Sequence, residues 1–345
     1  MENEKLSVII PVYNTAPHLA TCLESVLQQD YQDIEIICVN DASTDNSEEI
    51  LKRYSASDSR IRIINHEKNR GLLNARRTGV ENSSGGFIQF LDSDDTIDKK
   101  LCSSAVDLIK KHNTDFLQFS CRVFYTEKKH EDVIEPPNEK YIGQDILFHH
   151  YVTMHASTSI VFKIYRRELC QKAFEAIPDM YCYVGEDILS TFFISFFARS
   201  YIGMNTKQKY NYYFGKGVSS DNRISYDKFF QFCEMSKFPK IVEDFLLQSN
   251  SGETAFKAAE YMNYRLISDC CHMFALVSDV DKERAVECFW NHWSSNPYFA
   301  KGMMRAFNTQ FLVTEEVRNS ESYRIGNAVV TPLRNLRSLL FSKTR

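Results

Sequence analysis

Three aspartates, Asp92, Asp94 and Asp95, lie within four residues of one another, directly after the apolar run at residues 87–91. Aspartate is rare in strands, and three like charges this close repel one another. A hard divalent cation between them would favour the arrangement, because such ions are held by carboxylate oxygens. The alternative is a strand end followed by a helix that Asp95 or Thr96 caps. The cluster alone leaves both interpretations open.

A second acidic pair, Glu186 and Asp187, follows Gly185 and opens an apolar stretch that runs to Phe197. The spacing predicts a helix over residues 186–197. Acidic side chains are stabilised at a helix N-terminus by the positive end of the helix dipole. The pair is therefore either ordinary N-terminal charge or a carboxylate held in its ionised form for proton transfer.

The elements that would position these groups alternate along the first 95 residues. Apolar runs at residues 6–10, 34–39, 61–64 and 87–91 read as buried strands, and helical spacing separates them. This alternation predicts an α/β fold with an open, mostly parallel sheet and helices on both faces. Ligands of such sheets bind beyond the carboxyl ends of the strands. Tyr13, Asn14, Asp41 and the aspartates at 92–95 should therefore reach one ligand.

Farther along, strands are expected at residues 116–124, 160–165 and 210–214, and a charged loop or hairpin tip at 126–139. Residues 215–220 read as a loop. Helical periodicity dominates after residue 222. The sequence thus predicts two parts, an α/β domain over 1–222 and an α-helical region over 223–345.

Composition narrows the class of protein. A net charge of −4 over 345 residues provides no general attraction for nucleic acid. Ten cysteines without a CxxC pair match neither a zinc motif nor a small secreted framework. The polar start predicts no signal peptide, and the apolar stretch at 188–197 is too short to span a bilayer. We therefore expect a cytoplasmic protein.

The last 17 residues, 329–345, combine leucines with arginines and lysines. Such a segment suits a helix packed on a neighbour or in a homo-oligomer, or a helix lying on the membrane surface. Its modest basic charge favours packing or a subunit contact over the peripheral membrane interpretation.

Several ligand-binding motifs are absent from the sequence. The turn after the first strand is PVYN, so the GxGxxG of dinucleotide-binding enzymes is missing. No GxxxxGK[ST] loop and no GxSxG elbow occur. A calcium loop starting at Asp92 fails, because Ile97 and Ser103 stand where Gly and Glu are required.

Four segments together resemble successive motifs of the family 2 glycosyltransferases, which have the GT-A fold. They are residues 6–14 (LSVIIPVYN), 35–45 (EIICVNDASTD), 69–79 (NRGLLNARRTG) and 90–95 (FLDSDD). The resemblance continues more weakly at 185–187 and 210–220. It implies an inverting transferase that moves a sugar from a nucleotide-diphosphate sugar, most often a UDP-sugar, with Mn²⁺ or Mg²⁺. Residues 1–222 would bind the donor and catalyse transfer, and 223–345 would contact the acceptor, another subunit or a membrane surface.

The same resemblance implies roles for single residues. Asp41 would accept a hydrogen bond from the uracil N3, and Arg76 would lie near the diphosphate or base. The turn that lines the base and ribose would be formed by Pro11, Val12, Tyr13 and Asn14.

The resemblance also implies a different role for each acidic residue. Asp92 and Ser93 would face the ribose and donor sugar, and Asp94, with Asp92, would hold the metal. Asp187 would be the general base, while Glu186 would bind the acceptor or modulate the charge of Asp187. Asp95 is expected to be structural.

One departure from the family pattern concerns Asn40-Asp41-Ala42, where the family usually has Asp-Asp-Gly. The alanine predicts a backbone without positive φ at position 42. The tyrosines 181, 183, 210, 212 and 213 are equally compatible with stacking on acceptor sugar rings and with the core.

The expected acceptor is a glycan, either a surface or capsular polysaccharide precursor or a protein-linked glycan. Two alternatives stay open. One is a non-catalytic, sugar-nucleotide-binding partner of another glycosyltransferase. The other is a sugar nucleotidyltransferase, which the lack of a Gly-rich basic first turn disfavours.

Overall fold

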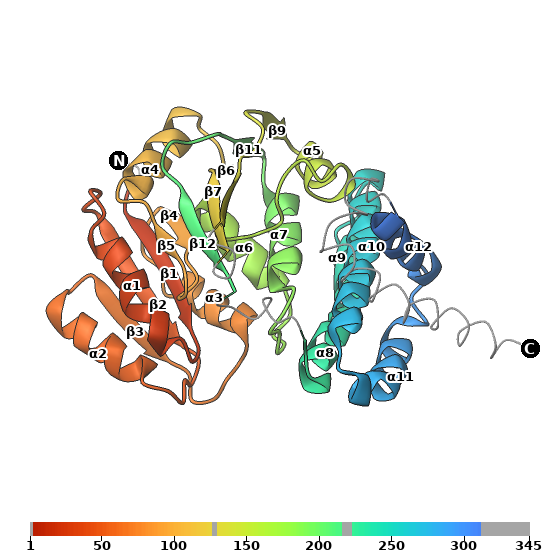
Figure 1. Cartoon of the computed structure of the whole chain (residues 1–345). Coiled ribbons are helices and arrows are strands. Elements are labelled where there is room, and N and C mark those ends of the chain that lie inside the picture. The colour runs from red at the N-terminus through yellow and green to blue at the C-terminus, as the bar shows by residue number, and fades with distance from the viewer. Residues whose placement is uncertain (1–2, 126–129, 216–222, 312–345) are drawn as a thin grey trace, which may run out of the picture. The chain divides into compact units, whose positions relative to one another are not determined.

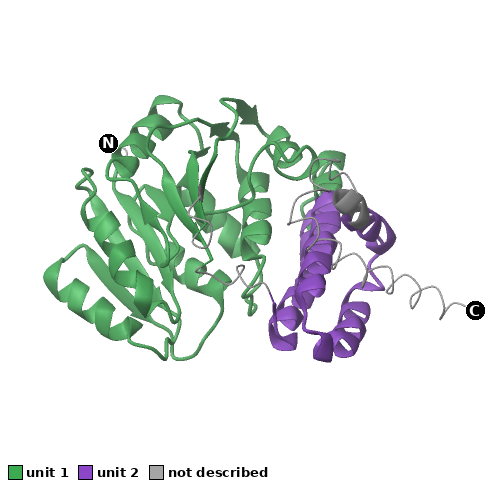
Figure 2. Ribbon diagram, in the orientation of Figure 1, with its two compact units in different colours: residues 1–220, 248–258 green, residues 221–247, 259–345 purple. Residues whose placement is uncertain are grey.

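The computed structural model describes residues 3–125, 130–215 and 223–311 (Figure 1). The chain divides into two compact units (Figure 2). The first comprises residues 1–220 with 248–258, and the second comprises 221–247 with 259–345. The predicted segment at 329–345 and most of the predicted loop at 215–220 lie outside the described residues.

The first unit is built on an eight-stranded sheet with the strand order β3-β2-β1-β4-β10-β6-β11-β9. β1 pairs in parallel with β2 and β4, and β2 pairs in parallel with β3. β10 is antiparallel to both of its neighbours, and β9 is antiparallel to β11. The strands are β1 Leu6–Val12, β2 Ile34–Asn40, β3 Ile61–Asn65, β4 Phe87–Phe90, β6 Phe116–Gln118, β9 Lys140–Ile142, β10 Lys163–Arg166 and β11 Ser200–Gly203. The prediction of a mostly parallel sheet is confirmed.

Continuous apolar runs form the central strands because both faces of a parallel sheet are covered. Every residue of β1 and β2 is buried. Helix α3 packs on β1 and β2 and also contacts α6 and α7, while α1 contacts α2. The helices flanking the sheet are α1 Ala16–Leu27, α2 Ser47–Ser57, α3 Leu72–Glu81, α4 Leu101–Lys111, α6 Arg167–Ala176 and α7 Glu186–Phe197; the short α5 Asp145–Leu147 leads into a π-helix at Phe148–Val152.

The predicted single strand at residues 116–124 is wrong, because the chain leaves the large sheet in the middle of this apolar run. The amide of Phe119 donates to the Phe162 carbonyl (3.2 Å), and that of Ser120 donates to the Thr206 hydroxyl (3.1 Å). β6 ends before these bonds, and β7 continues in a second sheet of order β5-β12-β7-β8. Its strands are β5 Thr96–Ile97, β7 Cys121–Tyr125, β8 His130–Ile134 and β12 Tyr210–Phe214.

The region at 126–139 contributes β8, which pairs antiparallel with β7 as one arm of a hairpin. This agrees with the hairpin alternative, while residues 126–129 lie outside the described part. The capping role considered for Asp95 and Thr96 is wrong. Thr96 begins β5, and the next helix starts only at Leu101.

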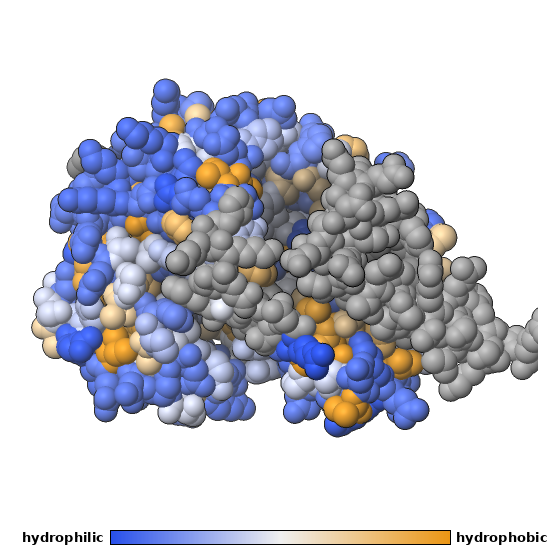
Figure 3. All heavy atoms as spheres, in the orientation of Figure 1, coloured by the Kyte–Doolittle hydropathy of each residue, from blue (hydrophilic) through white to orange (hydrophobic). Residues whose placement is uncertain are grey.

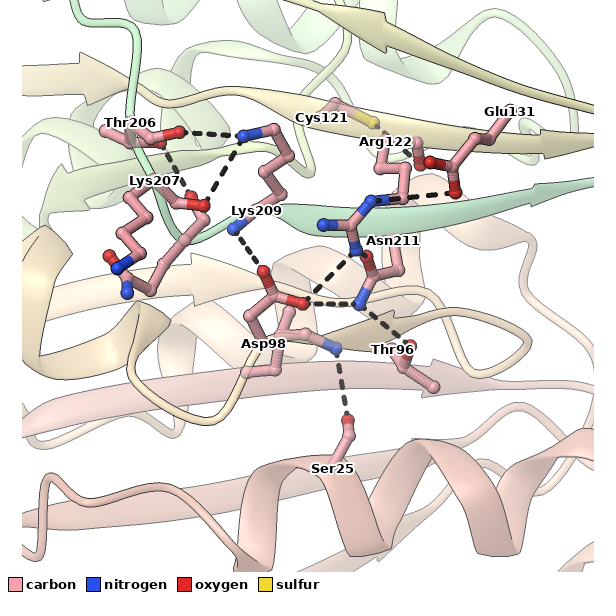
Figure 4. A network of polar contacts seen from close by, with 12 residues as sticks. Ser25, Thr96, Asp98, Cys121, Arg122, Glu131, Thr206, Lys207, Lys209 and Asn211 are labelled. Carbon is pink, nitrogen blue, oxygen red and sulfur yellow. Dashed lines mark hydrogen bonds and ion pairs between the residues drawn. The ribbon is translucent and has the colours of Figure 1, made fainter.

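A polar network links β5 and the residue after it, Asp98, to β12 and β7 of the same sheet (Figure 4). The carboxylate of Asp98 accepts from the Lys209 amide (3.0 Å) and from the Asn211 side chain (3.1 Å). Arg122 donates to the Asn211 side-chain oxygen (2.6 Å). Asn211 also reaches the Thr96 hydroxyl (3.3 Å). These bonds hold in place the segment that directly follows the aspartates at 92–95.

The second unit is helical, as predicted for the C-terminal region. Its helices are α8 Tyr226–Cys233, α9 Phe238–Gln248, α10 Glu253–Leu276, α11 Lys282–Trp293 and α12 Phe299–Phe311, with 3₁₀ turns at Glu234–Lys237 and Asp279–Asp281. The start of α10, through residue 258, belongs to the first unit.

Among the described helices, none is both long and apolar enough to cross a bilayer. The face of the first unit shown in Figure 3 is mainly hydrophilic, with small separate apolar areas. The expected cytoplasmic location stays a prediction.

A buried histidine makes the stability of the first unit depend on pH. His150 lies in the core beside Tyr201 (ring centroids 4.9 Å apart), and its Nδ1 lies 2.8 Å from the Ile146 carbonyl oxygen. Burial, aided by the charge of Lys163, lowers the pKa of His150 to about 3. Below pH ~6.5 the unfolded chain therefore takes up a proton that the folded protein excludes. The free energy of unfolding keeps the full contribution of neutral His150 above this pH and falls as the pH drops below it.

We expect His150→Phe to remove this dependence. In urea unfolding between pH 7.5 and 5, the free energy of unfolding of the wild type should fall more steeply than that of the variant. The difference in slope should approach about 1.4 kcal/mol per pH unit at the acid end. Parallel profiles for the two proteins would contradict an excluded proton at His150.

Candidate active site

The carboxyl ends of three adjacent parallel strands bring the predicted donor-binding residues to one edge of the large sheet. β1 lies between β2 and β4, with Val12 opposite Asn40 and Ile9 opposite Phe90. Pro11 and Val12 are buried within β1, so their side chains belong to the core. Tyr13 is the first exposed residue beyond the strand, at 38% exposure.

Asn14 ties the turn after β1 to the turn after β2. Its Oδ1 accepts from the Thr44 amide (2.7 Å), and its own amide donates to the Ser43 hydroxyl (3.1 Å). Asn14 itself has a left-handed backbone (φ 53°), which asparagine tolerates better than most residues. The two turns therefore form a single rigid rim around the end of the sheet.

The expectation for Ala42 is wrong, because its φ is 59°. Asn40 holds the turn by accepting from the Ser43 amide (3.1 Å). The left-handed conformation costs an alanine roughly 1–2 kcal/mol, which a glycine would avoid. Position 42 is therefore left-handed although it carries an alanine.

Asp41 is buried, and three nitrogen atoms lie within hydrogen-bonding distance of its carboxylate. The amides of Arg70 and Gly71 donate to its carboxylate (2.8 and 2.9 Å), and Nδ1 of His66 lies 2.6 Å from Oδ1. A carboxylate has about four acceptor positions, so one is left for a ligand N–H. Tyr181 stands close by: burial raises its pKa, and the charges of Tyr13 and Asp41 add to the rise.

His66 is a site residue that the sequence analysis missed. It follows β3, so it lies at the same sheet edge as the other turns, and its Nε2 lies 2.9 Å from the Thr78 hydroxyl. The place of His66 directly after the third parallel strand is the feature of the sequence that could have identified it. An open depression beside Asp41 is lined by Asn65, His66, Glu67, Lys68 and Arg70.

Arg76 joins the two acidic groups of the site. From the middle of α3, its guanidinium donates to Asp92 (2.7 Å) and to Glu186. Burial opposes the charged guanidinium, but the carboxylates of Asp92 and Glu186 outweigh this effect and raise the pKa of Arg76. The buried guanidinium of Arg76 thus links the segment after β4 to the start of α7.

Glu186 is fully engaged in this bridge, whereas Asp187 is half-buried. Burial raises the pKa of Glu186 to about 7; Arg76 opposes the rise, and the charges of Asp187 and Asp92 add to it. Asp187 accepts from the Ile188 amide through Oδ1 (2.8 Å). Asp187 lies in the first turn of α7, where the helix dipole favours an acidic side chain.

The aspartates after β4 have different surroundings. Asp92 is partly exposed, Ser93 is buried and Asp94 is half-buried. Asp95 is buried and accepts from the Tyr210 hydroxyl (2.7 Å) and the Tyr213 amide (2.8 Å). Asp95 therefore anchors β12.

Tyr210 is buried completely, and its hydroxyl also accepts from the Asp92 amide (3.2 Å). Of the two interpretations for this tyrosine, the structure supports the core. Tyr181, by contrast, is 52% exposed.

The chemistry of these donors fits a hard divalent ion. Burial raises the pKa of Asp95, and the charges of Asp94 and Asp92 add to the rise. In the described part of the chain these carboxylates do not form a ready-made group of three ligands. Mg²⁺ and similar ions at phosphate sites need only one or two protein carboxylates, with substrate phosphates as further ligands.

Replacing Arg76 tests the buried bridge. Arg76→Met should lower the free energy of unfolding by about 3–5 kcal/mol, because it leaves two carboxylates without their shared cation. Arg77→Met is the matched control, since the neighbouring arginine donates mainly to the carbonyls of Ile177 and Pro178. Urea denaturation of the three proteins measures the difference. Equal losses in both variants would contradict a structural role for the bridge.

Comparison with known proteins agrees with this geometry. Residues 7–174 match the family model for Glycosyl transferase family 2. The chain is 32% identical over 174 residues to the uncharacterized glycosyltransferase EpsJ of Bacillus subtilis, which is 49% of this chain and 49% of EpsJ. It is 44% identical over 113 residues to the glycosyltransferase GlyA of Streptococcus pneumoniae, which is 33% of this chain and 16% of GlyA. These matches thus span less than half the length of either relative.

A solved structure extends the likeness to most of the chain. S. aureus TarS 1–349 in complex with UDP-GlcNAc superimposes with a TM-score of 0.54 at 20% identity, covering 86% of this chain and 92% of TarS 1–349. At this identity the likeness concerns the fold, and it confirms the predicted GT-A architecture. The segment at residues 7–174, just under half of the chain, is thus similar in sequence to glycosyl transferase family 2, and the fold agrees with this similarity.

Proposed function

We propose that this protein transfers a sugar from a UDP-sugar to a hydroxyl group of a glycan acceptor, with inversion at the anomeric carbon. The observation that carries the proposal is the Arg76 bridge. It holds Asp92, from the carboxyl end of β4, and Glu186, beside Asp187, around one point at the sheet edge. The similarity to the family and the UDP-GlcNAc complex of the structural neighbour TarS support the choice of donor.

The rim of the site would bind the nucleotide. The remaining acceptor position of Asp41 suits the N3–H of uracil, and the exposed rings of Tyr13 and Tyr181 lie near it. Asn14 would keep the turn that faces the ribose in place. Asp92 and Ser93 would face the ribose and donor sugar. Oδ1 of Asp92 would at the same time keep its ion pair with Arg76. Arg76 itself is buried, so it would act on the donor through Asp92.

Asp187 would be the general base. An acceptor hydroxyl is a weak nucleophile, and a carboxylate that removes its proton during attack contributes roughly 10²–10⁴-fold to the rate. Glu186 would position Asp187 through the Arg76 bridge. Asp94, with Asp92, would hold Mn²⁺ or Mg²⁺, which when bound neutralises charge on the leaving diphosphate. The helical second unit would supply contacts to the acceptor glycan.

An assay of UDP release tests the proposal. The protein is incubated with Mn²⁺ and a panel of UDP-sugars, with and without glycan acceptors, and the anomeric configuration of any product is determined by NMR. We expect release from one donor, acceleration by a suitable acceptor, loss on addition of EDTA and restoration by Mn²⁺. Donor binding without turnover for any acceptor would identify a non-catalytic partner protein. Release of pyrophosphate from UTP and a sugar phosphate would identify a nucleotidyltransferase.

A further inference from the structure

The second unit gathers three thiols and an imidazole from helices far apart in the sequence. Cys233 ends α8, Cys270 lies in α10, and Cys288 and His292 lie one helical turn apart on α11. The ligand atoms of Cys233, Cys288 and His292 all lie within 4.8 Å of one another. The sulfur of Cys270 lies 3.7 Å from that of Cys233. This cluster has no role in the proposed transfer reaction.

The spacing of the atoms matches a tetrahedral metal site. Zinc binds thiolate sulfur at about 2.3 Å and imidazole nitrogen at about 2.0–2.1 Å, so tetrahedral angles place two sulfurs about 3.8 Å apart and a sulfur and a nitrogen about 3.6 Å apart. The Cys233 and Cys270 sulfurs are 3.7 Å apart, and Cys288 Sγ lies 3.7 Å from His292 Nδ1. Cys233, Cys288 and His292 need little movement to hold an ion, whereas Cys270 has to approach Cys288 and His292.

His292 is oriented by a carboxylate in the way a metal-binding histidine is. Its Nε2 lies 3.2 Å from Glu234 Oε1, which can accept an Nε2–H and leave Nδ1 unprotonated toward the sulfurs. Nδ1 also lies 2.8 Å from the Cys288 carbonyl oxygen. The contact with this carbonyl would suit an Nδ1–H, whereas the contact with Glu234 suits the Nε2–H tautomer that binds a metal.

The surroundings favour a thiophilic ion over calcium or magnesium. Two or three sulfurs and a nitrogen are soft donors, which zinc accepts and hard cations avoid. Cys233 and Cys270 are completely buried and Cys288 nearly so, whereas the side chain of His292 is 20% exposed. An ion could therefore enter past His292 into a site closed on its other sides.

We propose that Cys233, Cys288 and His292 bind a zinc ion that fastens α8 to α11, and that Cys270, which now contacts only Cys233 of these three, moves toward the ion as the fourth ligand. Binding would release the thiol protons to solvent, because zinc is held by thiolates. The sequence could not show this site by spacing, since the cysteines lie 37 and 18 residues apart along the chain.

Metal analysis of the full-length protein tests the proposal. The metal-depleted protein is incubated with one equivalent of Zn²⁺, passed through a desalting column and measured by elemental mass spectrometry. We expect about one zinc per chain in the wild type. Cys288→Ser and His292→Ala should lose most of it. Cys271→Ala is the matched control, because this neighbouring buried thiol contacts Met303 and lies outside the cluster, and it should retain the metal.

A second measurement on the wild type does not depend on the folding of variants. Loading with Co²⁺ should produce the intense visible absorption of a tetrahedral ion and a thiolate-to-cobalt charge-transfer band, both abolished by added Zn²⁺. Retention of zinc in the Cys288→Ser/His292→Ala double variant, or no cobalt spectrum in the wild type, would overturn the site. A Cys233–Cys270 disulfide in the freshly purified protein, found by mass spectrometry of peptides, would also overturn it in favour of a redox pair.

Discussion

Asp94→Asn is expected to lower the rate of metal-dependent sugar transfer by on the order of 10²–10³-fold, the usual effect of removing one group that stabilises developing charge. Asp94 is half-buried beside Asp92 and Asp95. Asp94 follows β4 in the segment that resembles the metal-binding motif of family 2, so it is the proposed metal ligand together with Asp92. The asparagine keeps the size of the side chain and removes its charge.

The measurement is UDP release as a function of Mn²⁺ concentration. The variant should need a higher Mn²⁺ concentration for half-maximal activity and should not reach the wild-type rate at saturation. Asp107→Asn, an exposed carboxylate on α4, controls for the change in charge and should behave like the wild type. An Asp94→Asn enzyme with an unchanged Mn²⁺ profile would remove this residue from the metal site.

Asp187→Asn is expected to lower kcat by about 10²–10⁴-fold, the contribution of a general base, with little change in KM for the donor. Asp187 is partly accessible at the start of α7, and its neighbour Glu186 is held by Arg76. An asparagine side chain can still accept the Ile188 amide hydrogen bond, so the helix start should be preserved.

Steady-state kinetics with donor and acceptor varied separately provide the test. Glu168→Gln is the matched control, because Glu168 is an exposed acidic residue in the first turn of α6. Asp187→Asn should lower kcat at every acceptor concentration while the KM for the donor stays near the wild-type value, and Glu168→Gln should leave both constants unchanged. If the variant instead raised KM for the donor at constant kcat, Asp187 would be a binding residue.

The order of elements and their burial could be predicted from the sequence. Buried parallel strands require continuous apolar runs, and those runs at β1, β2 and β4 are visible without a structure. The carboxyl ends of such strands must meet at one edge, so the placement of Tyr13, Asp41 and Asp92 near one another followed directly. The helix predicted over residues 186–197 is also confirmed as α7, because an acidic pair after Gly185 marks a helix start.

Local patterns failed where long-range contacts decide. The apolar run at 116–124 has no internal signal for its division, which depends on bonds from Phe119 and Ser120 to residues farther along the chain. Ala42 adopts a left-handed backbone because the turn is held on both sides, at a cost that propensity alone would avoid. Thr96 pairs with Asn211 in β12 instead of capping a helix.

The sequence by itself determined the family 2 motifs, the α/β order and the list of acidic residues with chemical potential, because these depend on residue type and short spacing. The folded chain adds the partners of these acids, which residue type and local spacing do not show. Arg76 comes from a helix between β3 and β4 and pairs with Asp92, 16 residues away, and Glu186, 110 residues away. The aspartate cluster seen first in the sequence is thereby separated into Asp95 for the core, Asp92 for the bridge and Asp94 for the proposed metal. The protonation and the contacts of a charged group depend on its burial and on the charges and hydrogen-bond donors around it. These neighbours come from distant parts of the chain, so the local spacing of residues does not show them.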